Sequence, residues 1–121
     1  MRLNHLDLCV PDVAAAASFF VNGFGFAVLN VVGEHEMAIL RGEDGFVVVL
    51  THAPDAHYPK SFHFGFLQDS PEGVRQAYAR LLAAGIDIPA PPAESPGALV
   101  MFCRMPSGIP VEVSYRGPPP T

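Results

Sequence analysis

The sequence predicts an α+β fold built from two copies of one module, because the same order of elements occurs twice along its 121 residues. Each copy begins with a strand that carries a histidine, continues with a helix and ends with three further strands. One helix covers only one face of such a sheet, so two βαβββ modules leave two open faces that can enclose one cavity. We therefore expect a single domain, residues 1–121, with module 1 at about 1–53 and module 2 at about 60–117, whose eight strands form a cupped, incompletely closed mixed sheet.

Module 1 opens with a strand at 3–10, in which polar and apolar side chains alternate. His5 and Asp7 point to one face of this strand, and Leu6 and Leu8 point to the other. The other expected elements are a helix at 13–20, capped by Asp12 and ended by Asn22-Gly23, and strands at 26–32, 36–41 and 46–51.

Module 2 repeats this order. Its first strand, at 61–67, places His63 on one face and three phenylalanines on the other. Ser70 and Pro71 start a helix that ends before Gly85. Three strands follow, at 86–88, 98–104 and 109–115, and a rigid proline-rich loop separates the first two of them.

Composition narrows the class of protein. The net charge of −5 and the lack of a basic stripe argue against nucleic acid as a partner. No apolar stretch approaches the roughly 20 residues that cross a bilayer, and the early first strand predicts no signal peptide. Cys9 and Cys103 lack disulfide-scaffold spacing. We expect a cytoplasmic protein with reduced thiols that acts on, or binds, a small molecule.

Three side chains form a candidate metal site. By alternation, His5, His63 and Glu112 all point to the open faces of their sheets. Two imidazoles and one carboxylate suit a divalent metal ion (Fe, Mn, Zn or Ni) and leave coordination positions for a substrate with adjacent oxygens. An inward Glu112 needs a counter-charge. The metal is one source; the alternatives are an ion pair with Arg104 and a metal-free cluster with ordinary core histidines.

Three further residues are candidates for catalysis. Asp7, on the face of His5, would act as a base, orient an imidazole or make only a polar contact at the rim. Arg104 would bind a substrate carboxylate or pair with Glu112. His52 lies in a predicted loop between the modules, where it is a candidate base; a loop position equally predicts an exposed histidine without a function.

The sequence resembles the vicinal-oxygen-chelate superfamily, also called the glyoxalase/bleomycin-resistance/dioxygenase family. The resemblance lies in the segments LNHLDLCVPDVAAAASFF…GFGF, SFHFGF and FCRMPSGIPVEV. It implies paired βαβββ modules and a divalent metal held by His5, His63 and Glu112. In many members it also implies a homodimer, in which His5 would serve the partner's metal.

Departures from the family pattern narrow the implied activity. Glyoxalase I uses a fourth ligand, a glutamate on the last strand of the first module, and Val49 matches that position, so a lactoylglutathione lyase is not expected. Phe102 matches a frequent tyrosine, Met105 replaces the usual aspartate of the last hairpin, and PAPPAESPGA lacks the phosphonate contacts of fosfomycin resistance. Two functions remain: a metal-dependent enzyme of dioxygenase, lyase or transferase type, and a metal-free protein of bleomycin-resistance type that sequesters a drug or natural product.

Overall fold

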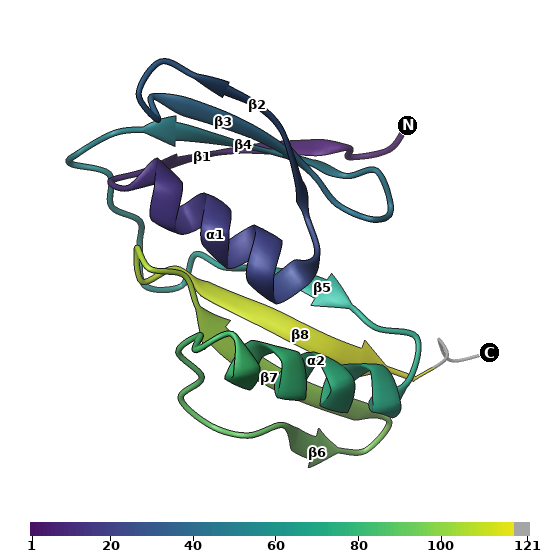
Figure 1. Ribbon diagram of the computed structural model, residues 1–121. Helices are drawn as coiled ribbons and strands as arrows, with labels where there is room; N and C mark the ends of the chain where they lie inside the picture. Colours follow the sequence, from purple (N-terminus) through teal and green to yellow (C-terminus); the bar gives the residue numbers. More distant parts are fainter. Residues whose placement is uncertain (118–121) are drawn as a thin grey trace. The chain divides into compact units, whose positions relative to one another are not determined.

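The computed structural model describes residues 1–117, which divide into two compact units (Figure 1). Unit 1 comprises residues 1–58, and unit 2 begins at Pro59. Each unit contains one strand, one helix and three further strands in that order, so the predicted α+β class and the two βαβββ modules are confirmed. The eight strands form two four-stranded mixed sheets. That the two units fold as a single domain remains a prediction.

Unit 1 consists of one sheet and one helix. Its elements are β1 (His5–Val10), α1 (Val13–Phe24), β2 (Ala27–Val32), β3 (Met37–Arg41) and β4 (Val47–His52). The strand order is β1-β4-β3-β2, in which β1 runs parallel to β4 and the other pairs are antiparallel. The parallel pair arises because α1 carries the chain from the end of β1 back across the sheet.

Helix α1 extends one turn beyond the predicted end. The carboxylate of Asp12 accepts a hydrogen bond from the Ala15 N–H at 3.0 Å, which confirms the predicted N-cap. The predicted stop at Asn22-Gly23 is wrong, because both residues lie inside the helix and Gly23 is buried. The helix ends instead at Gly25, whose φ of 70° is the left-handed conformation that glycine adopts without strain.

Side chains on the sheet of unit 1 alternate as predicted. Leu8, Val10 and Leu50 are buried on the face that α1 covers, whereas His5 and Asp7 are exposed on the other face. Within residues 1–58 no second helix covers that other face, which we call open face 1. Burial of the aliphatic side chains under α1 sets which way β1 presents its polar residues.

Unit 2 has the same architecture. Its elements are β5 (Phe64–Leu67), α2 (Pro71–Ala83), β6 (Ala93–Ser95), β7 (Ala98–Arg104) and β8 (Pro110–Arg116). The strand order is β5-β8-β7-β6, again with one parallel pair, β5 with β8. The hydroxyl oxygen of Ser70 accepts from the Gly73 N–H at 3.0 Å, so the predicted cap of α2 is confirmed.

The predicted strand at 86–88 is wrong. Asp87 makes only an isolated bridge with Arg104, and the edge strand β6 lies inside the segment expected to be a loop. The prolines before Ala93 have no N–H to donate, so pairing starts only after them. A tight turn at Pro96-Gly97, with Gly97 at φ 73°, then joins β6 to β7.

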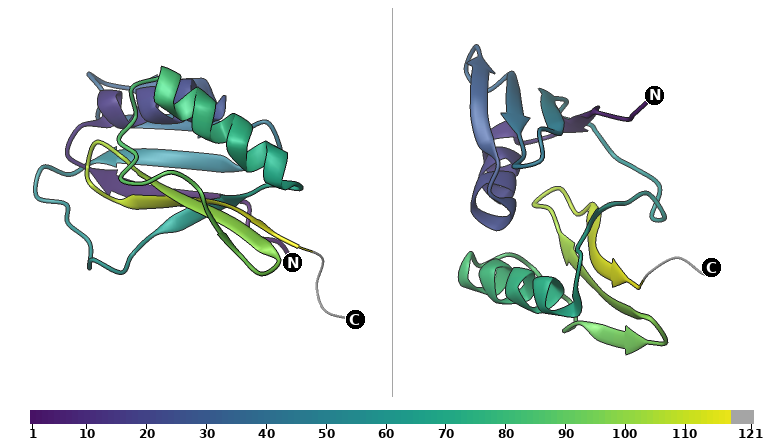
Figure 2. Two further views of the ribbon diagram at one scale, coloured as in Figure 1. Left: turned by 90° about the horizontal axis from the view of Figure 1, so that it is seen from below. Right: turned by 90° about the vertical axis from the view of Figure 1, so that its right-hand side faces the viewer.

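Helix α2 covers one face of the second sheet, as both views in Figure 2 show. Val111, Val113 and Leu99 are fully buried on that face. The residues between them along β7 and β8 therefore point to the other side, which we call open face 2. Within residues 1–117, neither helix is long and apolar enough to cross a membrane.

Candidate metal centre

Three neighbouring strands bring His63, Phe102 and Glu112 together on open face 2. His63 immediately precedes β5, and Gly65 of β5 pairs with Glu112 of β8, so His63 and Glu112 share a face, as predicted from alternation. Phe102 of β7 pairs with Glu112 from the other side. Its ring lies edge-on to the His63 imidazole, with 5.9 Å between the ring centroids.

The imidazole of His63 contacts a backbone carbonyl through one ring nitrogen. Its Nδ1 lies 2.9 Å from the carbonyl oxygen of Ser61. Because a carbonyl oxygen can only accept, Nδ1 carries the proton in this contact, and the lone pair of the neutral ring is on Nε2. A backbone carbonyl that holds Nδ1–H is the usual support of a histidine that binds metal through Nε2.

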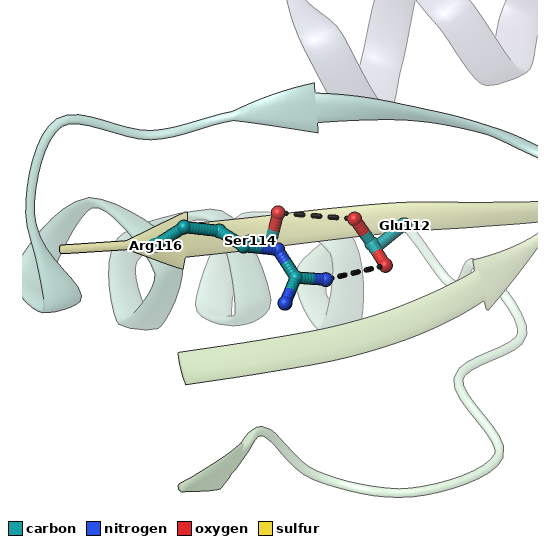
Figure 3. Close-up of polar contacts among 3 residues, drawn as sticks. All are labelled: Glu112, Ser114 and Arg116. Atoms are coloured by element: carbon teal, nitrogen blue, oxygen red, sulfur yellow. Dashed lines mark hydrogen bonds and ion pairs between the residues drawn. The ribbon is translucent and has the colours of Figure 1, made fainter. Parts of the chain in front are cut away.

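The carboxylate of Glu112 is held by two side chains of its own strand (Figure 3). The Arg116 Nη2 donates to Oε1 at 3.2 Å, and the Ser114 hydroxyl donates to Oε2 at 3.1 Å. The side chain of Glu112 is 21% exposed and that of Arg116 is 57% exposed. Arg116 thus supplies the counter-charge that a half-buried carboxylate requires.

Arg116 was not among the candidate residues, and the alternative of an ion pair between Glu112 and Arg104 is wrong. Arg104 instead lies beside Asp87, with 3.9 Å between the guanidinium and the carboxylate, and both side chains are more than half exposed. Such a pair contributes little to stability. Strand alternation contained the signal for Arg116, since residues 112, 114 and 116 share one face of β8.

Unit 1 carries the remaining histidine of the candidate set. The Nδ1 of His5 lies 2.7 Å from the amide oxygen of Asn4, and with the amide in this orientation the proton is on Nδ1 and the lone pair on Nε2. Asp7 lies two residues further along β1 on open face 1, where its carboxylate accepts from the Thr51 hydroxyl at 2.8 Å. Both residues are exposed.

His52 lies apart from these residues. It is the last residue of β4 rather than part of a loop, so the predicted loop position is wrong. Its backbone N–H donates to the Glu36 carbonyl at 2.8 Å, which extends the strand by one residue. By alternation with buried Leu50, His52 belongs to the helix-covered side of the sheet, opposite to His5 and Asp7.

The strand registers of the two units identify the residue that corresponds to Glu112. In unit 2 Gly65 pairs with Glu112, and in unit 1 Asp7 pairs with Val49. Gly65 and Asp7 each lie two residues after the histidine of their unit. Their partners therefore correspond to each other, and Val49 occupies the position of Glu112 in the repeat. Unit 1 therefore has valine where unit 2 has its candidate carboxylate ligand.

A shallow hollow of about 250 Å³ lies elsewhere in unit 1. Small and aliphatic side chains of α1 and β2 line it, together with His35. None of the candidate site residues is among its lining residues, so it is separate from the polar groups of open face 1.

The donor set fits a divalent ion in its chemistry. His5 and His63 have the tautomer that ligates through Nε2, and the Ser114 hydroxyl supports the carboxylate of Glu112 as an outer partner would. Unit 1 holds one of these donors and unit 2 holds the other two. Within residues 1–117, no group of three or more His, Cys, Asp or Glu side chains is arranged to hold a metal ion.

The sequence and the fold are similar to those of known proteins. The family model of the Glyoxalase/Bleomycin resistance protein/Dioxygenase superfamily matches residues 2–113. The solved structure of a possible glyoxalase from Bacillus cereus is 34% identical, with a TM-score of 0.80 over 93% of this chain and 97% of that one. No curated protein is significantly similar.

Two more distant structures share the fold. A lactoylglutathione lyase from Agrobacterium tumefaciens is 21% identical, with a TM-score of 0.75 over 94% of this chain and 92% of that one. A fosfomycin resistance protein from Listeria monocytogenes is 17% identical, with a TM-score of 0.80 over 95% and 93%. At these identities the likeness concerns the fold alone.

Proposed function

Because this chain belongs to the Glyoxalase/Bleomycin resistance protein/Dioxygenase superfamily, we propose that it is a metal-dependent enzyme acting on a small metabolite with neighbouring oxygen atoms. His5, His63 and Glu112 would hold the ion. The observation that carries the proposal is that the two histidines have the same hydrogen bonding at Nδ1. Each directs Nδ1–H to an oxygen acceptor and keeps its lone pair on Nε2.

The ligand set suits Fe, Mn, Zn or Ni, and the bound ion would act as a Lewis acid on a substrate oxygen. Asp7 is the proposed base, because the Thr51 hydroxyl orients its exposed carboxylate on the face of His5. Arg104 is a proposed contact for a substrate carboxylate, since its weak pair with Asp87 is readily exchanged. We also propose a homodimer, so that His5 would come from the same chain or from a second copy.

A lactoylglutathione lyase activity is not part of the proposal. That reaction would call for a carboxylate at Val49, where the register of unit 1 matches Glu112 of unit 2. The proposed reaction class is therefore a dioxygenase, lyase or transferase with a three-ligand site.

Metal content tests the proposal. Purified protein is dialysed against each metal in turn, and bound ion is counted by mass spectrometry for wild type, His63→Ala and Glu112→Ala. Wild type should bind one ion per chain, and each variant should lose affinity by at least about 100-fold, since loss of an outer partner alone costs about 10- to 100-fold.

Glu94→Ala is the matched control, because it removes a glutamate of unit 2 that is ion-paired with Arg75 at 3.0 Å and lies outside the candidate set. It should bind metal as wild type does. Absence of metal from the wild type, or equal binding by all four proteins, would refute the metal-dependent enzyme.

A second candidate, metal-free sequestration of a drug or natural product, is supported by the contacts of Glu112. Arg116 and Ser114 already satisfy this carboxylate without an ion. Large apolar side chains such as Phe102 (40% exposed) and Leu67 (72% exposed) offer contact area on open face 2. The same dialysis distinguishes the two functions. Sequestration predicts that metal-free protein binds its ligand and that the Glu112→Ala variant still binds it.

A further inference from the structure

We propose that Arg116 is a carboxylate-binding residue. In the metal-free protein it is paired with Glu112, and once Glu112 coordinates a metal ion, Arg116 binds the carboxylate of a ligand instead. The proposal extends the proposed function and rests on it for one point, the role of Glu112 as a metal ligand. It also names the class of ligand: an organic acid with an apolar body and adjacent chelating oxygens.

The contacts on β8 define the arrangement of these residues in the absence of metal. Glu112, Ser114 and Arg116 alternate along one face of the strand (Figure 3). One guanidinium nitrogen, Nη2, contacts Oε1, and the Ser114 hydroxyl contacts Oε2. A guanidinium has five N–H donors in a planar fork, so this contact uses only part of its capacity.

Exchange of partners would cost little, because the two contacts of Glu112 differ in burial. Arg116 is more than half exposed, and an exposed ion pair contributes little to stability. Ser114 is buried, so its hydroxyl keeps the carboxylate oriented when Oε1 changes partner. A divalent ion bound at Oε1 would displace the guanidinium, which would then be without its anion.

The surroundings of Arg116 favour a carboxylate with an apolar body. Ala98 pairs with Arg116 across β7 and β8, and its side chain is only a methyl group. Phe102 lies on the same face, 40% exposed, with its ring against His63. An aromatic acid could therefore pack its ring on Phe102 while its carboxylate accepts two parallel hydrogen bonds from Arg116.

The first experiment needs no metal. Benzoate is titrated by calorimetry into metal-free wild type, Glu112→Gln, Arg116→Gln and the double variant. Glu112→Gln releases Arg116 and should bind benzoate about tenfold more tightly than wild type, as a charge-assisted bidentate contact allows. The double variant should lose this gain. Equal binding by Glu112→Gln and the double variant would overturn the proposal.

The second experiment uses Zn²⁺. Arg116→Gln should bind Zn²⁺ several-fold more tightly than wild type, because no side-chain cation competes for Oε1. Arg75→Gln is the matched control: it removes an arginine of similar exposure (51% against 57%), paired with Glu94 of β6, and should leave Zn²⁺ binding unchanged. Unchanged Zn²⁺ affinity in Arg116→Gln would contradict the competition.

Ligand preference completes the test. Zn²⁺-loaded wild type should prefer 3,4-dihydroxybenzoate to catechol by about tenfold, and Arg116→Gln should lose the preference. Arg116→Lys, which keeps the charge without the planar fork, should retain only part of it. A wild type that binds no Zn²⁺ while Glu112→Gln gains benzoate binding would refute the proposed function and leave the anion site standing.

Discussion

Gly65 lies directly opposite Glu112 in the parallel pair of β5 and β8, and there is no room for a side chain between them. A Cβ at position 65 would lie 2.9 Å from the Glu112 carbonyl oxygen and 3.0 Å from its Cβ. Both distances are well below the 3.5–4.0 Å at which non-bonded carbon atoms attract. The glycine therefore allows the strand after His63 to pair closely with the strand that carries Glu112.

Gly65→Ala should destabilise the protein by about 1–3 kcal/mol, the usual cost of overpacking. The backbone of β8 would have to shift, so the variant should also bind metal more weakly. Urea denaturation measures the first effect and dialysis the second. Gly73→Ala is the control, since its Cβ would meet the flexible Gln68 side chain at 3.1 Å and alanine favours the helix. Equal destabilisation by the two substitutions would contradict this account.

Tyr58→Phe should expose the free edge of β1. The Tyr58 hydroxyl accepts from the Cys9 N–H at 2.9 Å and donates to the Cys9 carbonyl at 3.0 Å, so one hydroxyl covers both polar groups of an edge-strand residue. We expect a loss of about 1 kcal/mol and faster hydrogen exchange of the Cys9 amide. Tyr78→Phe, in helix α2, should leave that amide unchanged; unaltered exchange in Tyr58→Phe would show that the hydroxyl does not protect the edge.

The two cysteines should differ sharply toward iodoacetamide at pH 8. Both thiols are free, but Cys9 is exposed and Cys103 is fully buried. Burial raises the pKa of Cys103 from 9.0 to about 12, and the Asp87 carboxylate adds to this increase. Since the thiolate is the reactive form, mass spectrometry should find one label per native chain, on Cys9, and two labels after denaturation.

The raised pKa of Cys103 also predicts that the folded protein loses stability at alkaline pH. Well below pH 9 Cys103 is mostly protonated in both folded and unfolded protein, so it adds little pH dependence there. Between pH 9 and about 12 the unfolded thiol ionises while the buried thiol stays protonated, so the unfolded state gains relative stability. The stability difference between wild type and Cys103→Ala should therefore narrow as the pH rises through this window. A constant difference would contradict the raised pKa.

Asp12→Ala should cost about 1 kcal/mol, because it removes the acceptor for the Ala15 N–H at the start of α1. Asp12→Asn is the control, since its amide oxygen can accept the same hydrogen bond. Thermal unfolding compares the variants. If the asparagine variant were as unstable as the alanine variant, the charge of Asp12 would matter more than the cap.

Local patterns in the sequence were enough to predict the strand faces, the helix caps and the repeat. Alternation in 3–10 and 109–115 assigned His5 and Glu112 to the open faces, and Asp12 and Ser70 were recognised as caps. These features depend on residues a few positions apart, whose geometry follows from the period of a strand or the first turn of a helix.

The partners of the site residues, in contrast, became known only from the folded chain. Arg116 rather than Arg104 pairs with Glu112, β6 forms after the prolines rather than before them, and His52 belongs to a strand. Each outcome depends on strand register and on competition among several similar groups for one partner. Such choices differ by small free energies between residues distant in sequence, so local pattern carries little information about them.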